Sequence, residues 1–167
     1  MTIYNFKNPK TSAYKEFKSL VLSKDFPWHD TSIMLDDPDG DRFDSHCFLS
    51  RPTEDKRYCT VQSSEYIDQC YNVFMEIFDA NNWPIQCIFR MNANRTYPKH
   101  NMISKIGTKK KPALSKIHVD HPWRHSNLLI YLTNAGGKIV VEDEKRKIGD
   151  VPHMSLSHDP KEDDVVH

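Results

Sequence analysis

The residue types best suited to chemistry in this chain are a histidine and an aspartate, His118 and Asp120. They stand two positions apart, so in an extended segment both side chains point to the same face. An imidazole nitrogen and a carboxylate oxygen on one face supply two neighbouring ligands for a divalent metal ion. They are two of the three ligands of a 2-His-1-carboxylate triad, which leaves positions open on non-haem Fe(II). We therefore predict a metal site here; two polar residues on a solvated strand edge are the alternative interpretation.

Two helices are predicted in the N-terminal part of the chain, before the strands that must carry this pair. Thr11 or Ser12 can cap the first helix. Its apolar residues recur on one side: Tyr14, Phe17, Leu20 and Val21. The second helix opens at Ser63-Ser64-Glu65, and its apolar stripe comprises Tyr66, Ile67, Cys70, Val73, Phe74, Ile77 and Phe78. Trp83 and Pro84 end it, and we expect this stripe to pack against a sheet.

From Ile85 the apolar period changes to two, which predicts strands. Along 87–94, Arg90, Asn92 and Asn94 share one face, which suits a wall with a polar pocket side. A second strand is predicted over 126–133, behind the histidine and aspartate. A tight turn at 134–137 then returns the chain antiparallel over 138–142. Val165 and Val166 begin a further strand.

Composition and length limit the class of protein. The 167 residues suffice for one domain, and we expect a single domain over 1–167, with a helical part at 1–84 and a β core at 85–167. Twenty-three basic and 23 acidic residues balance, which gives no global electrostatic case for nucleic acid or an anionic membrane. The start lacks a secretory pattern, no apolar run could span a bilayer, and the four cysteines form no C-x-x-C pair. We expect a cytoplasmic protein with reduced thiols.

Three blocks of sequence together resemble a known family. They are Phe89–Asn94, the His118-Val119-Asp120 segment, and the stretch from Leu128 to Gly137. These blocks are similar to the Fe(II)- and 2-oxoglutarate-dependent dioxygenases, in particular to the small prolyl-4-hydroxylase-like proteins of marine tailed phages. A phage protein would act in the host cytoplasm.

The resemblance implies a mainly β fold, a double-stranded β-helix or jelly roll with the two N-terminal helices packed outside. It implies that His118 and Asp120 are iron ligands, and that Asn92, Asn94 and Tyr131 line the 2-oxoglutarate pocket. The implied reaction uses O₂ and 2-oxoglutarate, forms succinate and CO₂, and hydroxylates a C–H bond of an unknown substrate, a protein side chain or a small molecule.

The family pattern is incomplete at the end of the chain. The second iron-ligating histidine is expected on a late strand, after an apolar segment that Val165 and Val166 only begin. His167 falls before that position, and no basic residue follows to anchor the distal carboxylate of 2-oxoglutarate. A strand that stops after two residues leaves a sheet edge unpaired. We therefore expect a C-terminal truncation.

Two other functions stay open. A jelly-roll module without catalysis would act as a binding protein. A metallo-hydrolase is the third possibility, because residues 118–121 resemble the end of an H-x-H-x-D-H motif, but Lys116 stands where its first histidine belongs. Bound metal with succinate formation would separate the dioxygenase from the binding module, and zinc dependence without 2-oxoglutarate would favour the hydrolase.

Overall fold

The structure is a computed structural model that describes residues 3–30, 43–49, 64–96, 125–134, 139–141 and 156–167. The chain divides into two compact units, which we call the first and the second unit. The first unit comprises Met1–Lys24, Asp68–Cys87 and His125–His167, and the second comprises Asp25–Ile67 and Ile88–Arg124. The units alternate along the sequence, and each is described by itself.

Helix α1 spans Ser12–Val21 and confirms the first predicted helix. Thr11 has extended backbone angles, and its hydroxyl accepts a hydrogen bond from the Tyr14 N–H at 3.2 Å, so Thr11 is the N-cap. Tyr14, Phe17 and Val21 are buried, whereas the predicted Leu20 is only partly covered. The helix therefore presents one apolar side to the first unit.

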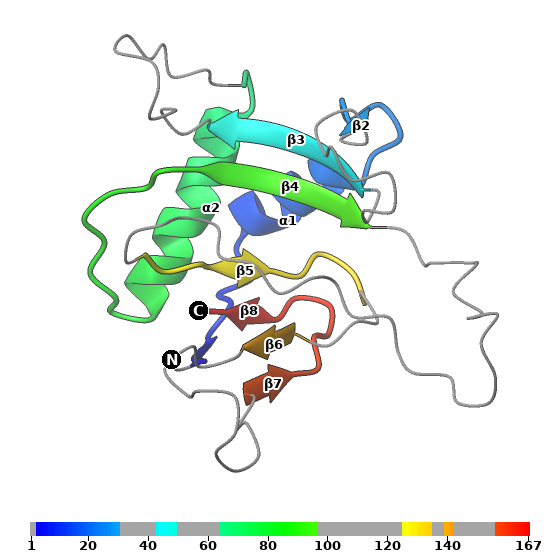
Figure 1. Cartoon of the computed structure of the whole chain (residues 1–167). Helices are drawn as coiled ribbons and strands as arrows, with labels where there is room; N and C mark the ends of the chain where they lie inside the picture. Colours follow the sequence, from blue (N-terminus) through cyan, green and yellow to red (C-terminus); the bar gives the residue numbers. More distant parts are fainter. Residues whose placement is uncertain (1–2, 31–42, 50–63, 97–124, 135–138, 142–155) are drawn as a thin grey trace, which may run out of the picture. The chain divides into compact units, whose positions relative to one another are not determined.

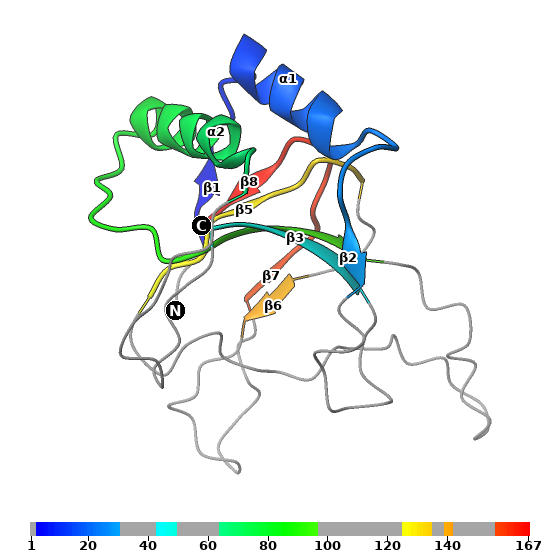
Figure 2. The same cartoon turned by 90° about the horizontal axis from the view of Figure 1, so that it is seen from above.

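Helix α2 spans Ile67–Ala80 and confirms the second predicted helix. Its buried residues are members of the predicted stripe: Cys70, Val73, Ile77 and Phe78. The Thr11 hydroxyl donates to the Glu76 carboxylate, which ties α1 to α2. Figure 2 shows both helices on the same side of the β1-β8-β5 sheet.

The sheet of the first unit has the strand order β1-β8-β5 (Figure 1), with β1 at Asn5–Phe6, β8 at Val165–Val166 and β5 at Leu129–Ile130. Both neighbours run antiparallel to β8. The prediction of a strand at Val165 is confirmed, but β8 is the central strand rather than an unpaired edge. Val165 and Val166 are 2% and 4% exposed, so their burial explains the central position.

A cluster around Asp163 holds α1 to the turn before β8. The Asp163 carboxylate accepts hydrogen bonds from the Tyr14 hydroxyl at 2.7 Å and from the Lys18 ammonium at 2.6 Å. Lys10 lies 2.9 Å from its second oxygen. Chiefly through the Lys18 hydrogen bond, these partners hold the pKa of Asp163 well below its ordinary value. Burial, followed by the hydrogen bond to Asp163, raises the pKa of Tyr14 to about 12.

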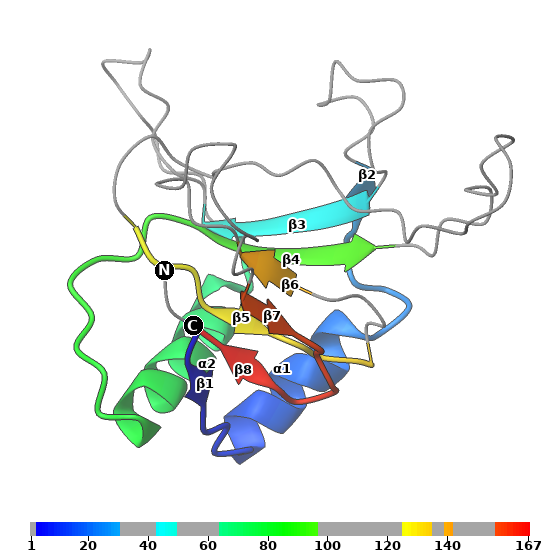
Figure 3. The same cartoon turned by 60° about the horizontal axis from the view of Figure 1, so that its bottom comes forward.

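The predicted hairpin between 126–133 and 138–142 pairs differently. Strand β6, Ile139–Val141, pairs antiparallel with β7, Leu156–His158, while β5 pairs with β8. The two pairs are therefore nested, with the β6·β7 pair inside the β5·β8 pair along the chain (Figure 3). Periodicity identifies a strand, but it does not identify its partner, and the turn at 134–137 lies largely outside the described residues.

The second unit contains a sheet of order β2-β3-β4, with β2 at His29–Asp30, β3 at Phe43–Leu49 and β4 at Met91–Thr96. The predicted strand over 87–94 is therefore displaced: residues 85–90 form no strand, and Cys87 and Phe89 are exposed. The pairing with β3 sets the bounds of β4, because the register runs from Leu49↔Met91 to Phe43↔Thr96. Met91 is buried and Asn94 is exposed.

The described residues thus form two helices and small antiparallel sheets. None of the helices described is long and apolar enough to cross a membrane. Cys47, Cys70 and Cys87 are free thiols, and burial raises the pKa of Cys70 to about 12.

Candidate functional site

His118 and Asp120, the predicted iron ligands, lie outside the described residues. The structure does describe the strand that follows them, β5, together with its neighbours. It also describes Asn92, Asn94 and Tyr131, the predicted 2-oxoglutarate contacts, and His167. Asn92 and Asn94 belong to the second unit, whereas Tyr131 and His167 belong to the first.

Tyr131 extends the pairing of β5 with β8 by one residue. Its N–H donates to the Asp164 carbonyl at 2.9 Å, and its carbonyl accepts from the Asp163 N–H at 2.7 Å. The Tyr131 backbone is therefore fixed on both sides by the segment that leads into β8. This arrangement lays the strand after the histidine and aspartate beside the strand that leads to His167.

The phenol of Tyr131 is half-buried. Burial, followed by the negative charge of Asp164, raises its pKa to about 12. The hydroxyl therefore keeps its proton at neutral pH and can donate a hydrogen bond to an anionic group. A carboxylate of 2-oxoglutarate is a group of that kind.

Asn92 and Asn94 share one face of the sheet with residues of β3. The register places Asn92 opposite Cys47 and Asn94 opposite Ser45, and directly opposed residues in an antiparallel pair point to the same side. The Asn94 side-chain oxygen accepts from the Ser45 hydroxyl at 3.0 Å. The alternation that the sequence predicts for these two asparagines holds within β4.

Arg90 lies beside Asn92. With the Asn92 amide turned so that its oxygen meets donors, that oxygen accepts from Arg90 Nε at 3.0 Å and from Nη2 at 2.7 Å. The amide nitrogen then donates to the Met91 carbonyl at 2.8 Å. A guanidinium group therefore adjoins Asn92, one of the predicted 2-oxoglutarate contacts. The sequence alone predicts no basic residue to anchor the distal carboxylate of 2-oxoglutarate.

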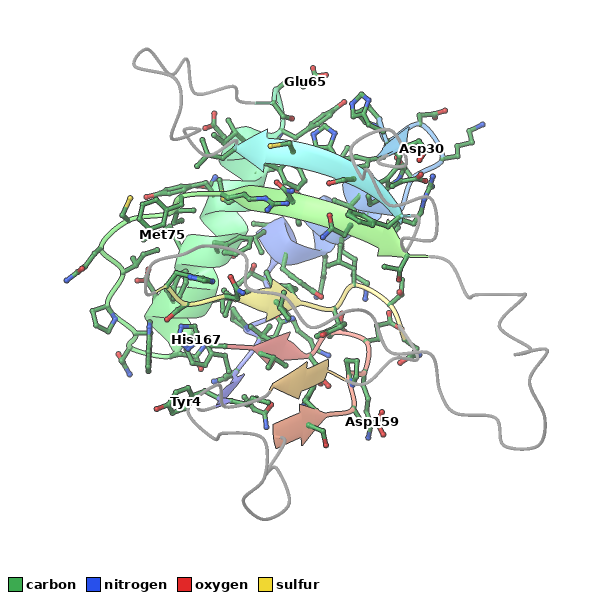
Figure 4. The ribbon with its side chains drawn as sticks, viewed as in Figure 1. Tyr4, Asp30, Glu65, Met75, Asp159 and His167 are labelled. Atoms are coloured by element: carbon green, nitrogen blue, oxygen red, sulfur yellow. The ribbon has the colours of Figure 1, made fainter. Side chains whose placement is uncertain are left out.

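His167 lies in an aromatic cluster of the first unit that also contains Tyr4, Phe6 and Trp83 (Figure 4 labels Tyr4 and His167). Its ring centroid lies 4.7 Å from that of Trp83 and 5.1 Å from that of Phe6. Nδ1 is buried and has no hydrogen-bond partner among the described residues. Burial lowers the pKa of His167, which favours the neutral imidazole.

One polar pocket of about 300 Å³ in the first unit was not anticipated from the sequence. Asn5 and Phe6 of β1 line it together with His158, Asp159, Lys161 and Asp164. His158 Nε2 lies 3.3 Å from an Asp164 oxygen without hydrogen-bond geometry, and the same oxygen accepts from the Lys161 N–H at 2.9 Å. Residues 158–164 look like a charged turn in the sequence, so only the pairing of β8 reveals this pocket.

Over the described part of the chain, no group of three His, Cys, Asp or Glu side chains is placed to hold a metal ion. Comparison with protein-family models, with curated proteins and with solved structures finds no significant match to this chain.

Proposed function

We propose that this chain is an Fe(II)- and 2-oxoglutarate-dependent dioxygenase of the hydroxylase type, built on a jelly roll. The proposal begins from the similarity of residues 89–94, 118–120 and 128–137 to that family. The structural observation that supports the proposal most is the nesting of the β6·β7 pair inside the β5·β8 pair along the chain.

A jelly roll forms when a long antiparallel hairpin folds over, so that successive pairs of strands are nested in sequence. The β5·β8 pair encloses the β6·β7 pair in this way. A simple meander would instead pair β5 with β6, which belong to different sheets. The observed pairing therefore supports the jelly roll over a meander.

The proposed roles follow from the chemistry of the side chains. His118 and Asp120 would ligate iron, with a second histidine completing the site. Asn92, Asn94 and Tyr131 would bind 2-oxoglutarate, and the protonated Tyr131 hydroxyl suits a carboxylate. Bound iron and 2-oxoglutarate would supply the O₂ chemistry, and the chain's own residues would bind and orient the cosubstrate. The substrate, a protein side chain or a small molecule, is not defined by these residues.

Anaerobic titration with Fe(II) and 2-oxoglutarate tests the proposal through the visible metal-to-ligand charge-transfer band. Two versions are compared: the 167-residue chain, and the chain continued through its reading frame beyond His167, where the family's second histidine is expected. We expect the band in at least one version, and we expect His118→Ala and Asp120→Ala to abolish it. His100→Ala, a histidine outside the proposed ligands, is the matched control and should retain the band.

The outcomes separate the three functions. A band that only the longer version shows supports a dioxygenase whose third ligand lies beyond His167. A band in neither version contradicts the dioxygenase and leaves a non-catalytic jelly-roll binding module. Metal-dependent hydrolysis with zinc and without 2-oxoglutarate would instead indicate the metallo-hydrolase.

A further inference from the structure

A buried histidine of the second unit forms a geometry that neither the iron site nor the 2-oxoglutarate contacts use. His46 lies in β3 and is 6% exposed. Its Nδ1 lies 2.9 Å from the Pro27 carbonyl oxygen, and its Nε2 lies 2.9 Å from the Ser64 hydroxyl oxygen. All three groups belong to the second unit.

These partners fix the tautomer of His46. A carbonyl oxygen can only accept, so Nδ1 must carry the hydrogen in the bond to Pro27. In the neutral imidazole Nε2 is then an acceptor, and the Ser64 hydroxyl donates to it. The hydroxyl proton of Ser64 therefore points at a basic nitrogen whose opposite side is held by a fixed acceptor.

Ser64 is also oriented by the chain that follows it. Its oxygen accepts from the Tyr66 N–H at 3.0 Å, and its carbonyl accepts from the Ile67 N–H at 3.1 Å. Ser64 is partly exposed, unlike His46, and stands just before α2; its neighbour Glu65 is labelled in Figure 4.

Aromatic rings hold the imidazole of His46 in place. The ring centroid of His46 lies 4.7 Å from that of Phe26, 4.8 Å from that of Phe48 and 5.9 Å from that of Tyr66. Rotation of the imidazole would break both of its hydrogen bonds inside this packing. The base is therefore preorganised toward Ser64, which is what an activated serine requires.

From this geometry we infer that Ser64 is a nucleophile activated by His46, with the Pro27 carbonyl as the group that orients the base, and that it takes acyl groups from small esters. The Ser64 oxygen attacks the ester carbonyl carbon while its proton passes to His46 Nε2. The tetrahedral adduct then expels the alcohol, which receives that proton, and leaves an acyl-serine. Water, deprotonated by the same nitrogen, releases the carboxylic acid and restores Ser64. The inference does not rest on the proposed dioxygenase.

The competing explanation is a structural one, in which Ser64 stabilises the turn at residues 64–67 and joins this turn to β3 through His46. Both explanations require the same two hydrogen bonds, so loss of stability on mutation cannot separate them. Chemical reactivity of the Ser64 oxygen does separate them, because a purely structural hydroxyl has no reason to react with an electrophile.

The first experiment treats the full chain with a fluorophosphonate and locates the adduct by intact mass and peptide mapping. We expect one adduct, on Ser64, and a stoichiometric burst of nitrophenolate from p-nitrophenyl acetate. Ser64→Ala should abolish both signals, and Ser19→Ala, which removes an exposed serine of α1, should retain both. No adduct on the folded chain, or an equal signal in Ser64→Ala, would overturn the inference in favour of the structural role.

The second experiment keeps the base and strengthens the nucleophile. In Ser64→Cys, iodoacetamide should alkylate the introduced thiol about a hundredfold faster than the exposed Cys87 of the same molecule, a factor typical of a positioned base. Adding His46→Gln, with folding checked by thermal unfolding, should remove that difference. If the introduced thiol reacts no faster than Cys87, His46 does not activate this position and the inference fails.

Discussion

The rings of His167 and Phe6 are stacked, with centroids 5.1 Å apart and planes that differ by 13°. The backbone fixes this stack, because Tyr4 and His167 exchange two hydrogen bonds, of 2.7 and 2.9 Å. An imidazole that packs as an aromatic ring while its Nδ1 lacks a partner among the described residues contributes apolar contact and costs desolvation.

His167→Phe should therefore raise the free energy of unfolding at pH 7 by about 1 kcal/mol, because it removes a buried polar atom and keeps the ring. His167→Ala, the matched control, should lower it. The pKa of His167 is lowered in the folded chain, so the unfolded chain binds more protons in acid. The free energy of unfolding of the native chain therefore decreases as the pH falls below about 6.5. Urea unfolding at pH 7 and pH 5 should show this loss in the native chain and a smaller one in His167→Phe. A destabilised His167→Phe would contradict the prediction.

Asp163→Asn should destabilise the first unit by about 1 to 3 kcal/mol at pH 7, because it removes the charge that holds Lys18 and Tyr14. Asparagine accepts the left-handed backbone at this position, where φ is 69°, so the change isolates the charge. Because the pKa of Asp163 is lowered in the folded chain, its charge contributes its full stabilisation above about pH 4, the ordinary pKa of an aspartate in the unfolded chain. This stabilisation is lost as the pH falls further. Acid unfolding below pH 4 measures this loss. Glu16→Gln on the exposed side of α1 is the control and should change little.

Thr11→Val should cost about 1 to 2 kcal/mol, since it removes the cap of α1 and the hydroxyl that donates to Glu76. Thr11→Ser keeps both interactions and should stay close to the native chain. Thermal unfolding compares the two variants. Equal melting temperatures for the valine and serine variants would show that neither interaction contributes.

Tyr131→Phe should leave folding intact, because β5 and β8 are joined through the Tyr131 backbone. If the hydroxyl donates to a carboxylate of 2-oxoglutarate, its loss should weaken cosubstrate binding about tenfold. Calorimetric titration with 2-oxoglutarate in the presence of Fe(II) without O₂ measures this affinity. Tyr71→Phe on the exposed side of α2 is the control, and equal affinities would remove Tyr131 from the pocket.

Both helices and their buried sides could be predicted, because Thr11 is a local cap and the apolar stripe of α2 repeats at the helical period. Their ends were less well defined, since α1 ends at Val21 and α2 begins only at Ile67. Strands β5, β6 and β8 could be predicted as strands but not with their partners, β4 was displaced along the chain, and β1, β2, β3 and β7 were not predicted. Leu129 pairs with Val166 across a large separation in sequence, and no local pattern encodes that choice. The same limit applies to His46, whose role depends on Pro27 and Ser64, residues of other segments that only the fold brings to its ring.

The pairing of β1 with β8 also bears on how the chain is made. Asn5 leaves the ribosome well before its partner Val166, which follows only after nearly all of the described residues have been synthesised. The sheet of the first unit therefore cannot close before β8 has been synthesised, and until then the apolar sides of α1 and α2 have no sheet to pack against. Chaperone binding to ribosome-bound intermediates should persist until β8 emerges, which makes this short strand the step that ends the exposure.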